Sequence, residues 1–230
     1  MEKRLSMSNT KTPANRDQSG LKRNGKRLRE RLAANPAIYA IPVEGAELWA
    51  LGEFMSAAEC EKVIAMIDAC AKPSTVFDLD YSSGYRTSYS GDVDPNDPFI
   101  KKLNRRVNDL LGIEPAWGET IQGQRYLPGQ QFQPHNDFFY PDTSYWEFEM
   151  ARGGQRSITA MVFLNDVEEG GHTEFTQLGI SIEPRQGTLL IWNNATPDGV
   201  TNEATMHAGR PVTKGVKYVL TKWYRTMKWN

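Results

Sequence analysis

The spacing of hydrophobic residues divides the chain into a helical first half and a β-rich second half. Hydrophobic positions at helical intervals predict a helix that starts at Ser56, forms a capping box with Glu59 and runs to about Cys70. A second helix is predicted from near Asp97 to a C-terminal stop at Gly112. Each helix has one apolar stripe, so we expect both to pack as scaffold against the rest of the chain.

From about residue 120 the pattern changes to short segments rich in β-branched and aromatic residues, separated by turn-forming pairs. This pattern predicts strands at residues 120–127, 131–139, 156–165, 173–176, 180–182, 187–192, 203–209 and 215–226. Short strands at this spacing favour an antiparallel sandwich or barrel. The predicted fold class is α+β, mainly β, with a double-stranded β-helix (jelly-roll) core and N-terminal supporting helices. Residues 140–155 are interpreted as a long functional loop or lid.

The first 36 residues differ from the rest in charge. Residues 1–31 carry ten Lys and Arg against Glu2, Asp17 and Glu30, a balance of +7 in a chain whose net charge is −1. We therefore predict a basic, flexible tail over residues 1–36 and a single domain over residues 37–230. Within that domain, helical support is expected at about 47–112 and the jelly-roll core at about 120–226.

Composition excludes several classes of protein. No window approaches 18 consecutive apolar residues, and the N-terminus lacks the apolar stretch of a secretory signal, so we expect a cytoplasmic protein without a membrane segment. No aromatic residue interrupts the basic segment, which disfavours nucleic acid as a partner. Cys60 and Cys70 fall on one predicted helix roughly 15 Å apart, too far for a disulfide.

The three histidines of the chain provide the candidate chemistry. His135 and Asp137 are two residues apart in a predicted strand, so their side chains share one face, and His207 can complete a set of two imidazoles and one carboxylate. Non-haem Fe(II) oxygenases use this set because it leaves coordination positions open. His172 and Glu174 form a competing pair, but it follows a turn and lies only 35 residues before His207. We favour the first pair and interpret His172 as a surface or supporting histidine.

A lysine in the last predicted strand adds a second chemical signal. Alternation along residues 215–226 turns Lys217 and Trp223 to the same inward face. A lysine that points into a β core is costly unless an anion meets it, and a dicarboxylic cosubstrate bound to the metal at one end would supply that anion at the other. Lys214 and Lys222 are the alternatives, which we expect to be exposed.

Several motifs occur in the order found in one enzyme family. They span residues 125–137, 156–159, 163–175, 207–217 and 222–223, preceded by Arg86-Thr87-Ser88 and by a segment at 51–67. Over about residues 47–226 the chain resembles the prolyl 4-hydroxylase branch of the Fe(II)/2-oxoglutarate dioxygenases. The resemblance implies an iron site made of His135, Asp137 and His207.

The same resemblance implies roles for further residues. Lys217 would form a salt bridge with the distal carboxylate of 2-oxoglutarate, and Tyr126 and Thr159 would lie beside this cosubstrate. Arg156 and Trp223 correspond to positions that line the substrate side. Two further candidate substrate residues are Phe132, which stands where the family often has Tyr, and Tyr140, one of several aromatic residues in the 140–155 region.

By this resemblance we expect a 2-oxoglutarate-dependent dioxygenase that hydroxylates an unactivated carbon, C4 of a prolyl residue in a peptide or protein, with succinate and CO2 as coproducts. The expected cofactors are Fe(II), 2-oxoglutarate and O2, with ascorbate as a candidate reductant. Two alternatives stay open: a hydroxylase of a small-molecule substrate, such as a free amino acid or natural-product intermediate, and a non-catalytic jelly-roll protein that senses 2-oxoglutarate or oxygen. Oxidative demethylation of nucleic acid is disfavoured, because the remainder of the chain is acidic and has no basic stripe.

Overall fold

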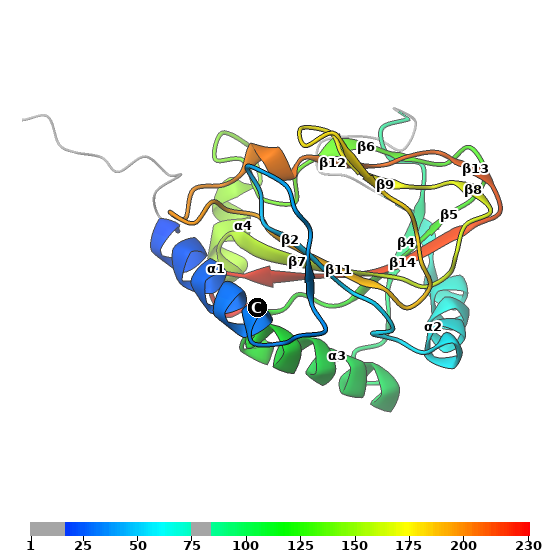
Figure 1. Cartoon of the computed structure of the whole chain (residues 1–230), viewed down its shortest axis with the longest axis horizontal. Helices are drawn as coiled ribbons and strands as arrows, with labels where there is room; N and C mark the ends of the chain where they lie inside the picture. Colours follow the sequence, from blue (N-terminus) through cyan, green and yellow to red (C-terminus); the bar gives the residue numbers. More distant parts are fainter. Residues whose placement is uncertain (1–16, 75–83) are drawn as a thin grey trace, which may run out of the picture.

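Two antiparallel sheets packed face to face form the centre of the molecule, and three helices cover the outer face of the larger sheet (Figure 1). The structure is a computed structural model and describes residues 17–74 and 84–230. Within these residues, no helix has the length and apolar character needed to cross a membrane. The arrangement confirms the predicted jelly-roll core with supporting helices.

The larger sheet has eight strands, each antiparallel to its neighbours. In spatial order they are β1 (Tyr39–Ala40), β2 (Leu48–Leu51), β11 (Leu189–Asn193), β7 (Arg156–Phe163), β14 (Lys217–Arg225), β5 (Gln122–Tyr126), β4 (Tyr89–Asp92) and β3 (Lys72–Pro73). The N-terminal region therefore supplies strands at both edges of this sheet as well as helices.

The smaller sheet lies above the larger one in Figure 1 and carries most of the candidate metal ligands. Its strands are β10 (Ile180–Ile182), β9 (Thr173–Phe175), β12 (His207–Gly209) and β6 (Phe132–His135), in that order. A separate two-stranded sheet pairs β13 (Val212–Lys214) with β8 (Glu169–Gly170), and short 3-10 turns occur at η3 (Pro115–Trp117) and η4 (Glu203–Thr205).

The hydrophobic core has two layers, and β7 contributes to both. One set of its side chains packs under the helices, namely Ile158, Ala160 and Val162. The alternate set, with Met161 and Phe163, packs between the two sheets. Because both faces of the strand are covered, its sequence is a nearly continuous apolar run rather than an alternating one.

The two predicted helices are confirmed. In α2 (Ala57–Cys70) the Ser56 hydroxyl accepts from the backbone N–H of Glu59, and the Glu59 carboxylate accepts from the backbone N–H of Ser56. In α3 (Pro98–Leu111) the Asp97 carboxylate accepts from the first free N–H groups, and Gly112 ends the helix at φ 67°. Cys60 and Cys70 are free thiols, as their spacing predicted.

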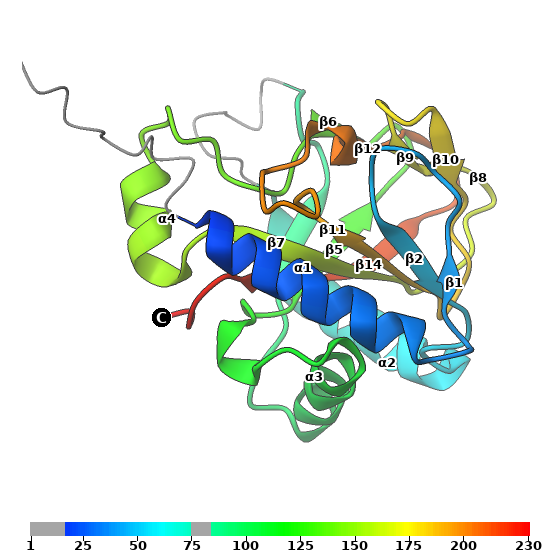
Figure 2. The same ribbon diagram turned by 60° about the vertical axis from the view of Figure 1, so that its left-hand side comes forward.

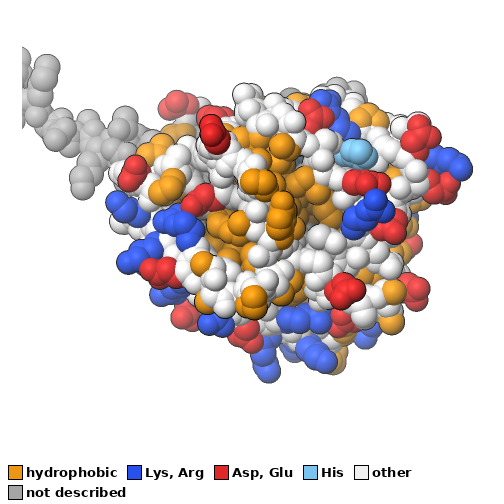
Figure 3. All heavy atoms as spheres, viewed as in Figure 1, with side chains coloured by type: hydrophobic (Ala, Val, Ile, Leu, Met, Phe, Trp, Pro, Cys, Tyr) orange, Lys and Arg blue, Asp and Glu red, His pale blue; other side chains and the backbone are white. Residues whose placement is uncertain are grey.

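The predicted flexible tail is wrong for residues 17–36, because this segment contains α1 (Gln18–Ala33). Leu21, Leu28 and Leu32 are buried on one face of α1, and the helix lies along the larger sheet beside α3 (Figure 2). Lys and Arg side chains of α1 occupy its outer face (Figure 3). The many basic residues led to the prediction of a flexible tail, but they lie on the solvent-facing side of an amphipathic helix. Residues 1–16 of the predicted tail lie outside the described residues.

Two other expectations need correction. The 140–155 segment is not a continuous loop, because it contains α4 (Trp146–Gly153), in which Trp146 and Met150 pack in a small cluster with Phe139. Lys222 is not exposed: its ammonium donates to the Glu119 carbonyl at 2.8 Å, and burial lowers its pKa to about 8. Alternation placed Lys222 on the opposite face of β14, but side chains of α3 and the backbone at Glu119 cover that face. Lys214 is exposed, as predicted.

Candidate active site and metal centre

The three predicted metal ligands come together where β6 and β12 pair. His135 and His207 are direct partners in this antiparallel pairing, although 72 residues separate them in the chain. Asp137 follows two residues after the end of β6. One ligand atom from each of the three residues lies within 4.8 Å of the others, a spacing at which a single ion could contact all three. We refer to His135, Asp137 and His207 as the ligand cluster.

Backbone carbonyls orient both imidazole rings of the ligand cluster. Nδ1 of His135 lies 2.8 Å from the Gln133 carbonyl, and Nδ1 of His207 lies 3.0 Å from the Thr205 carbonyl. A carbonyl oxygen can only accept, so Nδ1 is the protonated nitrogen in each ring and donates to it. Nε2 of each ring is left with a free lone pair for a metal ion.

The charge states of the cluster suit a divalent cation. Burial and the neighbouring His207 lower the pKa of His135 to about 3, so its imidazole is neutral at physiological pH. Burial opposes ionisation of Asp137, but the two histidines, Arg156 and a hydrogen bond from Thr159 outweigh it and lower its pKa. The cluster therefore presents the neutral imidazole of His135 and an ionised carboxylate, together with Nε2 of His207. This donor set fits Fe(II) and leaves part of the coordination sphere open.

Thr159 holds Asp137 in place. Its hydroxyl donates to Asp137 Oδ2 at 2.7 Å and accepts from the Asn194 side-chain amide at 3.0 Å. Thr159 does not itself line the cavity that holds Lys217. The geometry supports a role through the Asp137 carboxylate, and a place of Thr159 beside the cosubstrate stays a prediction.

Replacing Thr159 by valine keeps the size of the side chain but removes its hydroxyl. We expect the affinity for Fe(II) to fall about 10–100-fold, because supporting hydrogen bonds of ligating carboxylates have effects of this size. Anaerobic Fe(II) titration measures the change, and the KM for 2-oxoglutarate at saturating iron should stay the same. A raised KM for 2-oxoglutarate with unaltered iron affinity would favour the direct cosubstrate role instead.

A narrow inner cavity lies between the two sheets beside the ligand cluster, and Lys217 forms part of its wall. Lys217 is buried, donates from Nζ to the Thr173 hydroxyl at 3.1 Å, and lies 5.5 Å from the ring centroid of Tyr126. Burial lowers the pKa of Lys217 to about 7. No carboxylate of the described residues forms an ion pair with this ammonium. The inner cavity therefore offers a cationic end opposite the metal ligands.

A larger outer cavity of about 670 Å³ opens on the other side of the ligand cluster. Its walls combine aromatic side chains with charged and polar ones, and all four predicted substrate residues line it, namely Phe132, Tyr140, Arg156 and Trp223. The ring of Phe132 stacks on that of His135 with centroids 3.5 Å apart, and the Arg156 guanidinium lies 4.1 Å from the ring centroid of Trp223. Residues that line both cavities are Arg86, Phe132, His135, Asp137 and Trp223.

The competing pair lies outside the site. His172 Nδ1 contacts the Ser181 hydroxyl at 3.0 Å, and Glu174 forms an exposed ion pair with Arg210. Among the residues that the structure describes, the ligand cluster is the one group of three or more His, Cys, Asp or Glu side chains close enough to share a metal ion. The choice between the two pairs made from the sequence agrees with this geometry.

Sequence reasoning gave no site role to Arg86, Glu119 or Trp229, which all line the outer cavity. Arg86 is buried, with its guanidinium over the Phe132 ring at 4.7 Å. Glu119 binds Arg156 through two hydrogen bonds of 2.7 and 2.9 Å. The Arg86-Thr87-Ser88 motif was a sequence signal that could have identified Arg86. Glu119 had no such signal, because its arginine partners lie on strands that are distant in the sequence.

Comparisons with known proteins agree with the fold and the cluster. Residues 121–225 match the model of the 2OG-Fe(II) oxygenase superfamily. Prolyl 4-hydroxylase 1 of Arabidopsis thaliana is 32% identical over 195 residues, which cover 76% of this chain and 67% of that protein. The rat prolyl 4-hydroxylase subunit alpha-1 is 30% identical over 200 residues, and the match covers 82% of this chain but only 37% of the subunit. The chain belongs to the prolyl 4-hydroxylase branch of the 2OG-Fe(II) oxygenases.

Solved structures extend the comparison. The viral collagen prolyl hydroxylase of Paramecium bursaria Chlorella virus-1, in complex with 2OG, superposes with a TM-score of 0.61 at 27% identity, over 77% of this chain and 95% of that one. A Trichoplax adhaerens prolyl hydroxylase bound to a hypoxia inducible factor peptide fragment gives a TM-score of 0.60 at 14% identity, which supports the fold alone. The family implies Fe(II), 2-oxoglutarate and O2 as cofactors, and the donor set of the ligand cluster fits the metal.

Proposed function

We propose that this protein is a 2-oxoglutarate-dependent dioxygenase that hydroxylates C4 of a prolyl residue in a peptide or protein and releases succinate and CO2. The observation that carries the proposal is the position of the ligand cluster at the junction of two cavities. One cavity is narrow and has a buried lysine in its wall, and the other is wide and has several aromatic residues in its wall. This division suits a small dicarboxylate on one side and a larger substrate on the other.

In this proposal the Nε2 atoms of His135 and His207 and the carboxylate of Asp137 hold the iron. When bound, the metal supplies the activation of O2, with 2-oxoglutarate as the source of two electrons. Lys217 binds the far carboxylate of the cosubstrate and so fixes its direction in the inner cavity. Tyr126, whose ring lies beside the Lys217 ammonium, forms the adjacent wall.

The outer cavity suits a proline-containing chain. Aromatic side chains form flat surfaces against which the ring of an extended prolyl segment packs. Arg156 lies with its guanidinium against Trp223 and is held by Glu119. Its Nη1 group donates to the Asp137 carbonyl at 3.4 Å, which ties the arginine to the ligand cluster. These residues would orient the prolyl ring at the metal, and the surrounding aromatic wall would exclude water from the reacting carbon.

Mass spectrometry of a proline-rich peptide library tests the proposal. We expect peptide products heavier by one oxygen atom, formed in equal amount with succinate, and fragmentation that places the oxygen on proline. A panel of free amino acids serves as the comparison, because a cavity of this volume also accommodates a small molecule. Product from the amino-acid panel alone would replace the peptide substrate by a small one, and Fe(II) and 2-oxoglutarate binding without succinate on either panel would contradict the enzymatic function.

A further inference from the structure

Asp17 immediately precedes α1, but its carboxylate does not cap that helix. The Asp17 side chain makes no capping hydrogen bond, although aspartate at this position usually does so. Its Oδ2 atom instead accepts from the backbone N–H of Gln155 and from the Thr226 hydroxyl, both at 2.5 Å. Only 7% of Asp17 is exposed, and among the described residues no cation pairs with it. The buried carboxylate therefore binds the segment just before β7 instead of the N-terminus of its own helix.

Glycine at position 154 makes room for this contact. Gly154 has φ +76°, and a Cβ atom there would lie 2.6 Å from Asp17 Oδ2 and 2.2 Å from the Thr226 hydroxyl oxygen. A side chain at this position would push the carboxylate away. The contact between the Asp17 carboxylate and the segment before β7 therefore depends on a glycine at position 154.

Gln155 connects this contact to the wall of the outer cavity. Its side-chain carbonyl accepts from the backbone N–H groups of Phe139 at 2.7 Å and Arg156 at 3.0 Å, and its amide donates to the Phe139 carbonyl at 2.8 Å. The backbone of Phe139 is therefore bound in both directions by one side chain. The Phe139 ring lies 4.9 Å from the Arg156 guanidinium, and both residues line the outer cavity.

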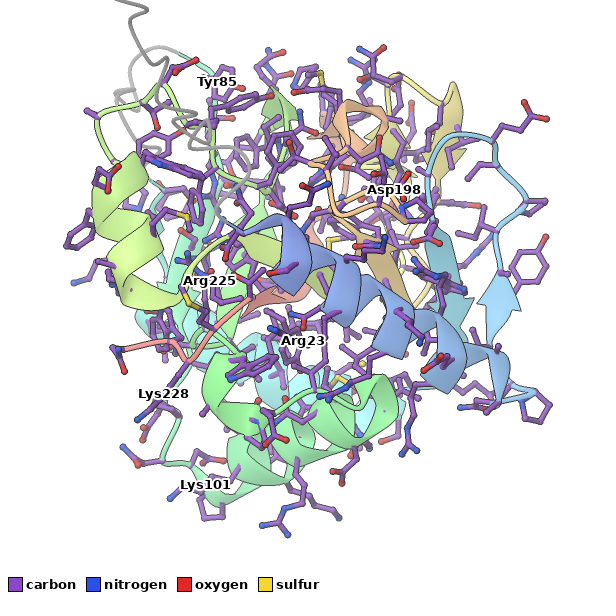
Figure 4. The ribbon with its side chains drawn as sticks, turned by 90° about the vertical axis from the view of Figure 1, so that its left-hand side faces the viewer. Arg23, Tyr85, Lys101, Asp198, Arg225 and Lys228 are labelled. Atoms are coloured by element: carbon purple, nitrogen blue, oxygen red, sulfur yellow. The ribbon has the colours of Figure 1, made fainter. Side chains whose placement is uncertain are left out.

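The surroundings make this connection stiff. Figure 4 shows Arg225 beside α4 and the first turn of α1. Its guanidinium donates to the Gly154 carbonyl at 2.7 Å and lies 4.5 Å from the Phe139 ring centroid. A displacement of Gln155 cannot be absorbed by empty space, because well-packed interiors transmit such shifts to their neighbours.

We propose that Asp17 is a positioning residue for the substrate site: through Gln155 it fixes Phe139 and Arg156 in the wall of the outer cavity. This inference rests on the proposed function of that cavity. It assigns a part in substrate binding to a segment that precedes the family-matched residues 121–225. The start of α1 belongs functionally to the active site, although Asp17 touches neither metal nor substrate.

The test is the replacement of Asp17 by alanine in the full chain. We expect kcat/KM for a hydroxylated proline-containing peptide to fall roughly ten- to hundredfold, mainly through KM, because small misplacements of positioning groups have effects of this size. The KM for 2-oxoglutarate should not change, because the inner cavity is not involved. Asp17→Asn keeps an acceptor oxygen for both donors and should recover most of the loss.

Arg29→Ala is the matched control. Arg29 lies near the other end of α1 and pairs with Glu47 at 2.9 Å, far in the chain from the cavity wall. This variant should lower the melting temperature somewhat and leave the KM for the peptide unchanged. Equal KM increases in Asp17→Ala and Arg29→Ala, or a lower melting temperature in Asp17→Ala without any change in KM, would overturn the proposal.

Amide hydrogen exchange separates this inference from the proposed function. In Asp17→Ala the amides of Phe139 and Arg156 should exchange at least about tenfold faster than in the parent protein, and in Arg29→Ala they should not. This measurement needs no substrate. Failure of the proposed function would show as no hydroxylated peptide with the parent protein, whereas unchanged exchange at both amides would refute the positioning role of Asp17 by itself.

Discussion

Replacement of His207 by alanine is expected to abolish hydroxylation and to lower Fe(II) affinity by more than about 100-fold. Loss of a supporting hydrogen bond alone costs up to that factor, and this change removes a donor atom itself. The ring is held by the Thr205 carbonyl with Nε2 facing the cluster, so no neighbouring side chain can take its place without rebuilding β12. Metal analysis after anaerobic reconstitution, together with succinate release at saturating 2-oxoglutarate, measures both effects.

His172→Ala is the control for this prediction. His172 lies immediately before β9. Among the described residues, the Ser181 hydroxyl is the one hydrogen-bond partner of its ring. Iron content and turnover should both stay at the level of the parent protein. Full activity in His207→Ala, or loss of iron in His172→Ala, would show that the ligand cluster has been assigned to the wrong histidine.

How far the fold could be predicted depends on where each signal lies in the chain. The helix that begins after Ser56 has its capping box and apolar stripe within one short segment, so the sequence was sufficient to define it. In α1 the stripe is interrupted by Asn24, which is buried because its amide reaches the Ser157 hydroxyl and the Arg225 carbonyl. Those partners lie more than a hundred residues away, and no local pattern reveals them.

The same distinction applies to the site. The metal ligands could be predicted because the chain has few histidines and because the spacing of His135 and Asp137 is itself informative. Lys217 could be predicted from strand alternation, but the same argument failed for Lys222. Alternation assigns residues to two faces of a strand and does not say whether a helix covers the second face. Thr159 and Asp137 are likewise joined by the packing of separate strands.

Binding of 2-oxoglutarate should weaken as the pH rises above about 7, because of Lys217. Burial lowers the pKa of Lys217 to about 7 in the open site, so the ammonium is present below that pH and is lost above it. Only the charged form can pair with the distal carboxylate. The KM for 2-oxoglutarate should therefore be constant below pH 7 and rise about tenfold per pH unit above it. His135 does not contribute in this range, since its pKa of about 3 leaves it neutral throughout.

Two substitutions at Lys217 distinguish charge from shape. Lys217→Ala leaves the far carboxylate without a partner and should raise the KM for 2-oxoglutarate about 30-fold or more at pH 7, while iron affinity stays the same. Lys217→Arg keeps a positive charge at every accessible pH and should flatten the pH dependence, even if the larger guanidinium weakens binding overall. An equally steep rise of KM with pH in Lys217→Arg would mean that another group titrates, and the anion partner of 2-oxoglutarate would have to be sought elsewhere in the inner cavity.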